Sequence, residues 1–142
     1  MAVRLINRLS EKQVEELQAL YQQAWWSRGR RLEDVRLMLA ATDLILALED
    51  ADTGELVAFS RVLTDGVYRA HLFDVIVKES HRGQGLGRAI MDAVTNHPVL
   101  GRIEKLYLSC RTELVPFYGE WGFTAELGKD IHFMVRSREK AS

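Results

Sequence analysis

The stretch Arg82-Gly83-Gln84-Gly85-Leu86-Gly87 decides how the rest of this sequence is interpreted. An apolar run over residues 73–77 precedes it and apolar residues at helical spacing follow it, so the pattern predicts a strand, a tight turn and a helix. Glycines allow close approach to the backbone, and the first N–H groups of a helix carry about half a positive charge, which suits a diphosphate. Arg82 and Arg88 can add charge-assisted contacts. The turn is therefore predicted to bind an anion.

Two other phosphate motifs do not fit this turn. A P-loop would end in Gly-Lys-Ser or Gly-Lys-Thr, and the spacing of Gly83, Gly85 and Gly87 differs from that of a dinucleotide fingerprint. A structural role remains open as the alternative, because glycines also permit a tight strand-to-helix turn that binds nothing.

The composition fits one ordinary globular domain. The 142 residues are 47% hydrophobic and contain no repeat or linker, so we expect a single domain over residues 1–142. Lys and Arg number 19 against 20 Asp and Glu, which gives a formal net charge of −1. This balance favours neither nucleic acid nor a membrane surface as a partner, and indicates a small or locally recognised one.

The single cysteine and the short apolar runs bear on location. Cys110 cannot form an internal disulfide, and the sequence offers no thiolate cluster for a metal. No apolar run has the length of a membrane span or a signal peptide. We therefore expect a cytoplasmic protein without a metal, in which Cys110 is buried and unreactive.

Periodicity predicts an α/β (α+β) fold with a mixed central sheet of about seven strands and four helices, in the order β-α-α-β-β-β-α-β-α-β-β. Ser10 and Gln13 form a capping box at the first helix start, and Asp65-Gly66 is typical of a two-residue hairpin turn. The apolar stripe expected on this first helix is Val14, Leu17, Leu20, Tyr21 and Ala24. The expected strands are 3–9, 44–49, 56–64, 67–77, 105–110, 123–125 and 131–136, and the expected helices begin near residues 11, 32, 86 and 115.

With these elements, the sequence resembles the GCN5-related N-acetyltransferase (GNAT) family. That family's cofactor turn has Arg or Gln, two residues, Gly, one residue, then Gly or Ala, and Arg82, Gly85 and Gly87 match it. The segment from Phe117 to Phe123 is similar to the family's late Phe-Tyr, three residues, Gly-Phe segment. The element order is also the family's, so the resemblance covers essentially the whole chain.

The resemblance implies acetyl-CoA as the cofactor, with its pyrophosphate on the turn. In the family the central strand parts from its neighbour at a bulge, and its exposed backbone pairs with the pantetheine arm. A fully paired central strand is equally compatible with the composition. The implied cofactor-binding residues are Val75, Ile76, Val77, Arg82, Gly83, Gln84, Gly85, Leu86, Gly87, Arg88 and Tyr118.

The resemblance also implies a proton donor and suggests two candidate bases. Tyr118 is at the position of the family's usual acid, and its phenol is protonated at neutral pH; packing beside Phe117 is the alternative. Asp74 could orient a substrate ammonium or relay its proton, or could accept structural hydrogen bonds. His71 could act as a base through its imidazole, although a lone histidine in a strand is more often a packed or surface residue.

The acceptor is expected to be a small-molecule or peptide amine, including a protein lysine. The family implies that it lies near the first two helices, where residues 25–31 supply aromatic faces for a cation or ring and arginines for a carboxylate or phosphate. A core tryptophan followed by a solvated basic loop is the alternative. The candidate substrate residues are Trp25, Trp26, Arg28, Arg31, Asp65 and Asp74.

Two functions stay open. The first is an acetyl-CoA-dependent N-acetyltransferase acting on a primary amine by direct attack in a ternary complex. The second is a non-catalytic acyl-CoA sensor or interaction module. The acyl-chain preference, and whether the chain forms a homodimer, stay undecided by the sequence.

Overall fold

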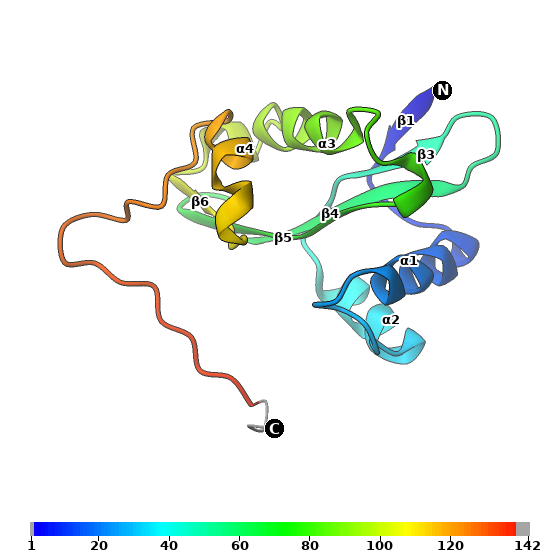
Figure 1. Ribbon diagram of the computed structural model, residues 1–142, viewed down its shortest axis with the longest axis horizontal. Coiled ribbons are helices and arrows are strands. Elements are labelled where there is room, and N and C mark those ends of the chain that lie inside the picture. Colours follow the sequence, from blue (N-terminus) through cyan, green and yellow to red (C-terminus); the bar gives the residue numbers. More distant parts are fainter. Residues whose placement is uncertain (1, 139–142) are drawn as a thin grey trace. The chain divides into compact units, whose positions relative to one another are not determined.

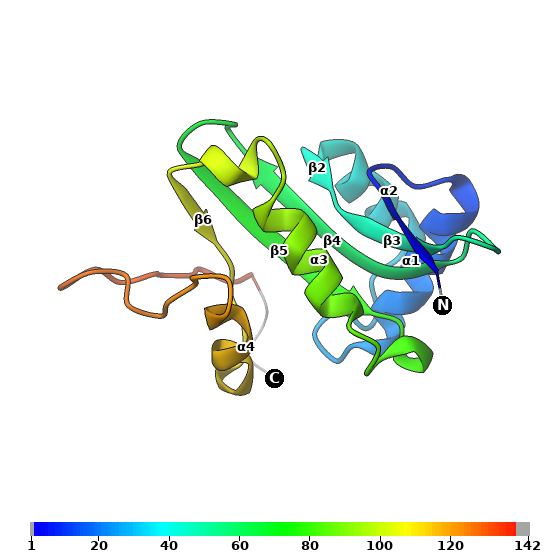
Figure 2. The same ribbon diagram turned by 90° about the horizontal axis from the view of Figure 1, so that it is seen from above.

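The computed structural model describes residues 2–138, which form two compact units. The first unit, up to Ser109, contains a six-stranded sheet with the order β1-β3-β4-β5-β6, and β2 pairs with β4 beside β3 (Figures 1 and 2). The strands are β1 (Val3–Ile6), β2 (Leu44–Ile45), β3 (Ala47–Asp50), β4 (Leu56–Thr64), β5 (Arg69–Val77) and β6 (Lys105–Tyr107).

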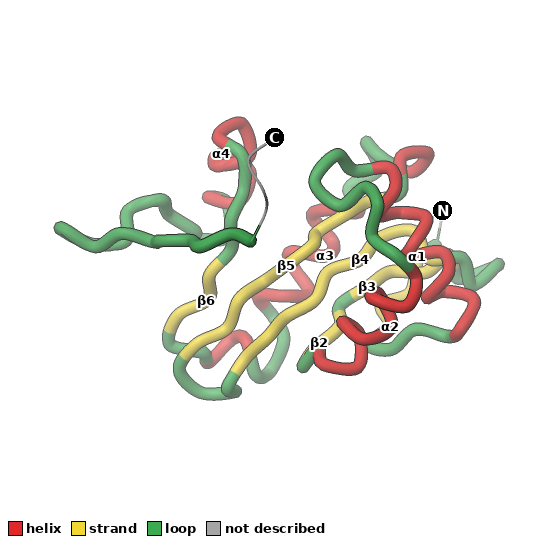
Figure 3. Tube along the Cα trace, turned by 90° about the horizontal axis from the view of Figure 1, so that it is seen from below, coloured by secondary structure: helices red, strands yellow, loops and turns green. Residues whose placement is uncertain are grey.

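The sheet is mixed, as the sequence predicts. Strands β1 to β5 pair antiparallel, whereas β6 runs parallel to β5 (Figure 3). The expected strand 44–49 is divided, because Leu46 separates β2 from β3. The predicted two-residue hairpin is wrong, because β4 and β5 are joined by four residues, 65–68. An aspartate causes this wider turn: the Asp65 carboxylate accepts hydrogen bonds from the backbone N–H groups of Val67, Tyr68 and Arg69.

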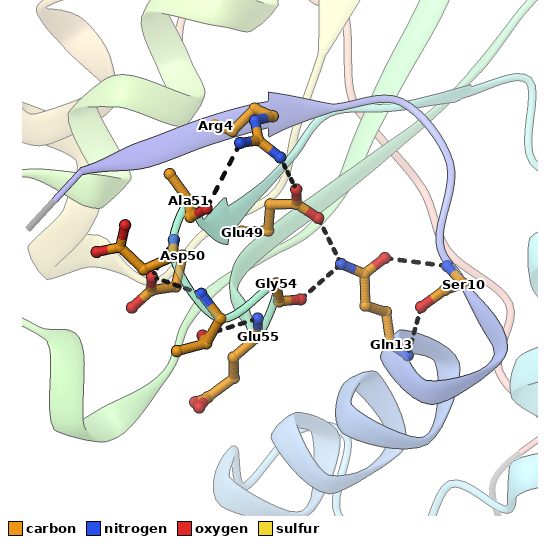
Figure 4. Close-up of polar contacts among 10 residues, drawn as sticks. Arg4, Ser10, Gln13, Glu49, Asp50, Ala51, Gly54 and Glu55 are labelled. Atoms are coloured by element: carbon orange, nitrogen blue, oxygen red, sulfur yellow. Dashed lines mark hydrogen bonds and ion pairs between the residues drawn. The ribbon is translucent and has the colours of Figure 1, made fainter.

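Helix α1 (Glu11–Gln23) begins at the predicted capping box. The Ser10 hydroxyl accepts from the Gln13 backbone N–H at 3.2 Å, and the Gln13 side chain accepts from the Ser10 N–H at 3.0 Å. The Gln13 amide also donates to the Glu49 carboxylate and to the Gly54 carbonyl (Figure 4). Arg4 binds the other oxygen of Glu49, so this network fixes α1 to β1 and β3.

Helices cover both faces of the sheet. Helices α1 and α2 (Leu32–Ala41) lie on one face, and α3 (Leu86–Thr95) lies on the other (Figure 1). The core under α1 and α2 includes the whole apolar stripe predicted for the first helix. Its buried members are Val14, Leu17, Leu20, Tyr21, Ala24, Val35, Ala47, Leu56, Phe59 and Ile76. Two short 3₁₀ turns, Glu79–His81 and Leu100–Arg102, flank α3.

The second unit begins at Cys110 and contains a 3₁₀ turn (Thr112–Leu114) and α4 (Val115–Gly119). Gly122 follows with φ of 88°, a left-handed conformation typical of a glycine that follows a helix. The expected strands 123–125 and 131–136 are wrong for this structure, because residues 123–138 contain no strand. Gly128 and Asp130, which have positive φ angles, lie between the two expected strands, and in the described chain neither of these segments pairs with a strand edge, as a strand requires.

In the described residues the two units together contain four α-helices, as expected, and six strands, one fewer than the expected seven. No helix in residues 2–138 is long and apolar enough to span a membrane. The expectation of one domain over residues 1–142 stays a prediction, since each unit is compact by itself.

Candidate functional site

A β-bulge in β5 is the first unusual feature of the candidate site. Phe59 pairs with Ile76 and Arg61 pairs with Phe73, so β5 carries one extra residue opposite Ser60. Asp74 lies in this bulge with φ of 57°, a left-handed conformation that costs a non-glycine residue about 1 kcal/mol. An aspartate at such a position requires compensation from its side chain.

The compensation comes from three donors on one oxygen. Oδ2 of Asp74 accepts hydrogen bonds from the Tyr21 hydroxyl at 2.9 Å, from Nη1 of Arg30 at 2.9 Å and from Nε of Arg61 at 2.7 Å. The Asp74 side chain is only 7% exposed. These contacts connect α1, the α1–α2 loop, β4 and β5.

Both arginines also lie over aromatic rings. The Arg30 guanidinium is 4.5 Å from the ring centroid of Tyr21 and 5.6 Å from that of Trp26. The Arg61 guanidinium is 4.7 Å from the ring centroid of Phe73. Stacking of this kind attracts the cation and restricts the planar group to one orientation.

The α1–α2 loop that carries Arg30 is held by polar side chains of α1. The Arg30 carbonyl accepts from the side-chain amides of Gln18 and Gln22, at 3.2 and 3.1 Å. Gln22 also accepts from the Gly29 backbone N–H, and the buried Ser27 hydroxyl donates to the Tyr21 carbonyl. Hydrogen bonds therefore hold the backbone of Arg30 in place as well as its side chain.

The cluster controls the protonation of its members. Burial raises the pKa of Asp74, but the hydrogen bonds and positive charges of Arg61 and Arg30 outweigh it and hold that pKa below its usual value. Burial and the Asp74 charge raise the pKa of Tyr21, so its phenol stays a donor. A carboxylate with a lowered pKa is a weak proton acceptor, and the geometry favours an anchoring role for Asp74 over the expected proton relay.

His71 lies three residues before Asp74 on β5. Its ring stacks on Phe73 at a centroid distance of 4.2 Å, and Phe73 in turn carries the Arg61 guanidinium. Burial and then the charge of Arg61 lower the pKa of His71. Its imidazole is therefore neutral at pH 7, which is the form that can accept a proton.

Beyond His71, one edge of β5 is unpaired in the described chain. Strand β6 pairs with β5 only from Arg69 to His71, while β5 continues to Val77. The predicted separation of the central strand from its neighbour is therefore present, and it begins beside the bulge. Residues 72–77 offer backbone groups that an extended ligand can use as a strand would.

The glycine turn connects the end of β5 to α3. Gly83 and Gly85 have φ of 80° and 79°, and a Cβ atom added at either residue would meet no heavy atom within 4 Å. Gly85 is the N-cap of α3 and supplies no side-chain cap. The first N–H groups of a helix have no partner within the helix, so the start of α3 can bind an anion from the open side.

Tyr118 belongs to the second unit. It lies on α4, is 9% exposed, and packs edge to face against Phe117 and Phe123. Burial, followed by the charge of Cys110, raises the pKa of Tyr118, so its hydroxyl is protonated at neutral pH.

Cys110 does not match its expectation. The residue is exposed, not buried. Partial desolvation and then the Glu113 carboxylate raise the pKa of its thiol. A raised pKa gives little thiolate, so the thiol is not activated as a nucleophile.

Of the predicted substrate residues, Asp74 itself and Trp26, through Arg30, take part in the Asp74 cluster. Trp25 is 66% exposed, the Arg28 guanidinium donates to the Gln22 carbonyl, and Arg31 pairs with Glu33 outside the cluster. Asp65 caps the β4–β5 turn.

The sequence reasoning missed Tyr21, Arg30 and Arg61 as site residues. Tyr21 was assigned to the core stripe alone, although its hydroxyl needs a partner when buried. Arg61 interrupts the apolar strand β4, and Asp74 interrupts β5. These two opposite charges in neighbouring strands were a readable sign of an ion pair.

Comparison with known proteins identifies the family of this chain. Residues 6–123 match the model of the acetyltransferase (GNAT) family. The chain is 28% identical over 139 residues to GCN5-related N-acetyltransferase 1, chloroplastic, of Arabidopsis thaliana, covering 96% of this chain and 70% of the relative. It is 34% identical over 91 residues to glucosamine 6-phosphate N-acetyltransferase 1 of Oryza sativa subsp. japonica, covering 60% of this chain and 55% of the relative.

Solved structures share the fold. A Xanthomonas campestris pv. campestris protein belonging to the GNAT family has a TM-score of 0.77 at 29% identity, covering 89% of this chain and 87% of that one. A GNAT family acetyltransferase of Streptococcus pneumoniae has a TM-score of 0.76 at 23% identity, covering 97% of this chain and 100% of that one.

The mixed sheet with its bulged central strand and the glycine turn at a helix start belong to the fold that these acetyltransferase structures share. The chain belongs to the acetyltransferase (GNAT) family. The names of its relatives support acetyl transfer as its general chemistry. Because one relative is chloroplastic, the cytoplasmic location stays a prediction.

The anchoring role of Asp74 predicts how stability depends on pH. Asp74→Asn should lower the free energy of unfolding by about 2–3 kcal/mol at pH 7, since two arginines lose their carboxylate. The folded pKa of Asp74 lies below its unfolded value near 4, so its contribution is fully present above about pH 4 and is lost as the pH falls further. Urea unfolding of both proteins from pH 3 to 8 measures the difference.

Asp52→Asn is the matched control, because Asp52 is exposed in the β3–β4 turn and should leave stability nearly unchanged. A stability difference for Asp74→Asn that already shrinks above pH 5 would show a raised pKa and would favour the proton relay instead.

Proposed function

We propose that this protein transfers an acetyl group from acetyl-CoA to a primary amine, by direct attack in a ternary complex. The observation that carries the proposal is the continuity of the unpaired β5 edge with the glycine turn at the start of α3. An extended arm and a diphosphate at its end would use these two features in succession. Acetyl-CoA would supply an activated thioester carbonyl as the acetyl donor.

The donor side fits the residues expected from the sequence. Val75, Ile76 and Val77 would pair with the pantetheine arm through their backbone, and residues 82–88 would hold the pyrophosphate. Arg82 and Arg88 are exposed at this turn, as charge-assisted contacts require. Tyr118 would contact the sulfur end of the cofactor.

The chain's own residues would move two protons. The amine nitrogen forms a bond to the thioester carbonyl carbon while the bond from carbon to sulfur breaks. Neutral His71 would accept the proton that the amine nitrogen loses, and the Tyr118 hydroxyl would donate a proton to the departing thiolate. Asp74 would act as a positioning residue for the acceptor side.

A non-catalytic acyl-CoA sensor is the second candidate. The intact Tyr118, with a pKa raised by burial, favours the enzyme because a sensor would not need a proton donor at this position. The acceptor stays open between small molecules, peptides and protein lysines, since the relatives' names include both a sugar phosphate and serotonin as acceptors. The chain also spans only 70% and 55% of the two relatives described above.

Replacing Gly85 tests the donor site. Gly85→Leu should weaken coenzyme A binding by at least 100-fold, because the side chain would enter the pyrophosphate position. Isothermal titration calorimetry with coenzyme A measures this loss. The substitution also adds about 1–2 kcal/mol of strain at a positive φ.

Gly66→Leu controls for the strain. Gly66 has φ of 82° with no heavy atom within 4 Å of an added Cβ, and it precedes β5, whereas Gly85 follows it. The control should lose similar stability and keep coenzyme A affinity. Retained affinity in Gly85→Leu would refute the proposed pyrophosphate site.

Removing the Tyr118 hydroxyl tests the acid. Tyr118→Phe should leave the Kd of coenzyme A near wild type and lower kcat by about 100-fold, because the thiolate loses its proton donor. Thiol release with an amine panel gives kcat, and Tyr68→Phe, an exposed tyrosine of the β4–β5 turn, is the control. Unchanged turnover would remove Tyr118 from the mechanism.

Replacing His71 tests the base. Because the pKa of His71 is lowered, its imidazole is mostly neutral at pH 7, and wild-type kcat should fall only below the ordinary histidine value of about 6.5. His71→Gln should lower the plateau by about 10–100-fold and abolish this acid limb. His132→Gln, at an exposed histidine of the second unit, should keep both. An unchanged acid limb in His71→Gln would assign the base elsewhere.

A further inference from the structure

The charges at the Asp74 cluster do not balance. Two guanidinium groups, those of Arg30 and Arg61, share one carboxylate, and Tyr21 is neutral because its pKa is raised. Among residues 2–138, no second carboxylate pairs with either arginine. The cluster therefore holds one uncompensated positive charge.

This charge lies in a partly desolvated position. The side chain of Arg61 is 14% exposed and that of Arg30 is 34% exposed. An uncompensated cation is costly when water is largely removed from it, so a natural partner for it is an anion. The intermediate exposure of Arg30 leaves a route by which such an anion can arrive from solvent.

The two guanidiniums are also preorganised. Arg30 is fixed by Asp74, by the rings of Tyr21 and Trp26, and through its carbonyl by Gln18 and Gln22. Holding an arginine side chain in one conformation costs conformational entropy, and for an exposed arginine without a binding role no interaction offsets this cost. A fixed planar fork matches the geometry of carboxylate and phosphate oxygens.

We propose that the amine acceptor carries a carboxylate or phosphate group, and that Arg30 and Arg61 bind this group. The inference rests on the proposed acetyl transfer and names its substrate class: a small amine with an anionic substituent. Trp26 forms one wall through its ring, and Asp74 is a positioning residue that sets both guanidiniums.

The position of the cluster explains why the anion would aid catalysis. Arg61 stacks on Phe73, and Phe73 stacks on His71, so the anion site and the proposed base are joined by one row of contacts on β4 and β5. An acceptor held by its anion at Arg30 and Arg61 would direct its amine toward His71 and the unpaired β5 edge. Holding both ends of a small acceptor reduces the entropy lost in reaching the transition state.

Matched acceptor pairs test the substrate class with the wild-type protein. One arm compares amino acids of increasing chain length with their amides, and the other compares amino alcohol phosphates with the unphosphorylated alcohols. For at least one pair, the anionic member should have a kcat/KM about 10–100-fold higher, as expected for charge-assisted contacts. The arm that responds tells carboxylate from phosphate.

Variants test the residues. Arg30→Gln and Arg61→Gln should raise KM for the preferred anionic acceptor about 10–100-fold, with a smaller change in kcat and no change for its uncharged partner. Arg30→Lys should restore only part of the affinity, because an ammonium lacks the planar fork. Arg36→Gln removes the same charge from an exposed pair with Glu11 and should behave as wild type. Circular dichroism and coenzyme A binding confirm that each variant is folded.

Two outcomes overturn the inference while acetyl transfer stands. One is that uncharged amines are acetylated as well as, or better than, every anionic partner. The other is that folded Arg30 and Arg61 variants keep the wild-type KM for an anionic acceptor. If no amine in either arm yields thiol although coenzyme A binds, the proposed function itself fails, and the inference fails with it.

Discussion

The carboxylate of Asp74 makes the interactions on which the arrangement of α1, the α1–α2 loop, β4 and β5 depends. Tyr21 from α1, Arg30 from the α1–α2 loop and Arg61 from β4 all donate to one oxygen on β5. The left-handed backbone of Asp74 is unfavourable by itself, and these three bonds offset it. The bulge and the ordered loop are therefore one feature, because the side chain that stabilises the bulge also holds the loop.

The same bulge separates two tasks along β5. From Arg69 to His71, before the bulge, β5 pairs with β6, whereas from residue 72 onward this edge is unpaired in the described chain and leads to the glycine turn. Under the proposed function, backbone groups would thus bind the extended donor, and side chains would bind the acceptor. In a regular strand without a bulge, side chains alternate between the two faces of the sheet in one register from end to end. Such a strand could not combine these two functions.

Local patterns predicted most of the first unit. The capping box of Ser10 and Gln13, the stripe on α1 and the glycine turn depend on neighbours within a few residues, and each is confirmed. The hairpin turn was predicted too short, because the Asp65 carboxylate binds three backbone N–H groups and favours a wider turn than Asp-Gly alone implies. Residues 123–125 and 131–136 were predicted to be strands, but strand formation depends on a partner edge that composition does not encode.

Site residues divide along the same line. The glycine turn is a contiguous motif and could be predicted directly from the sequence. The Asp74 cluster, in contrast, joins residues from positions 21 to 74 and exists only in the folded chain. The sign of this cluster in the sequence was one charged residue in each of two apolar strands, Arg61 and Asp74. By themselves these two residues would form an ion pair with no net charge. Arg30, which lies on the loop and is held by Gln18 and Gln22, adds a second positive charge to this pair. The cluster therefore has a net positive charge. Under the proposed function, specificity for the acceptor would thus depend on a loop, which can change its residues without disturbing the strand and turn proposed for the donor.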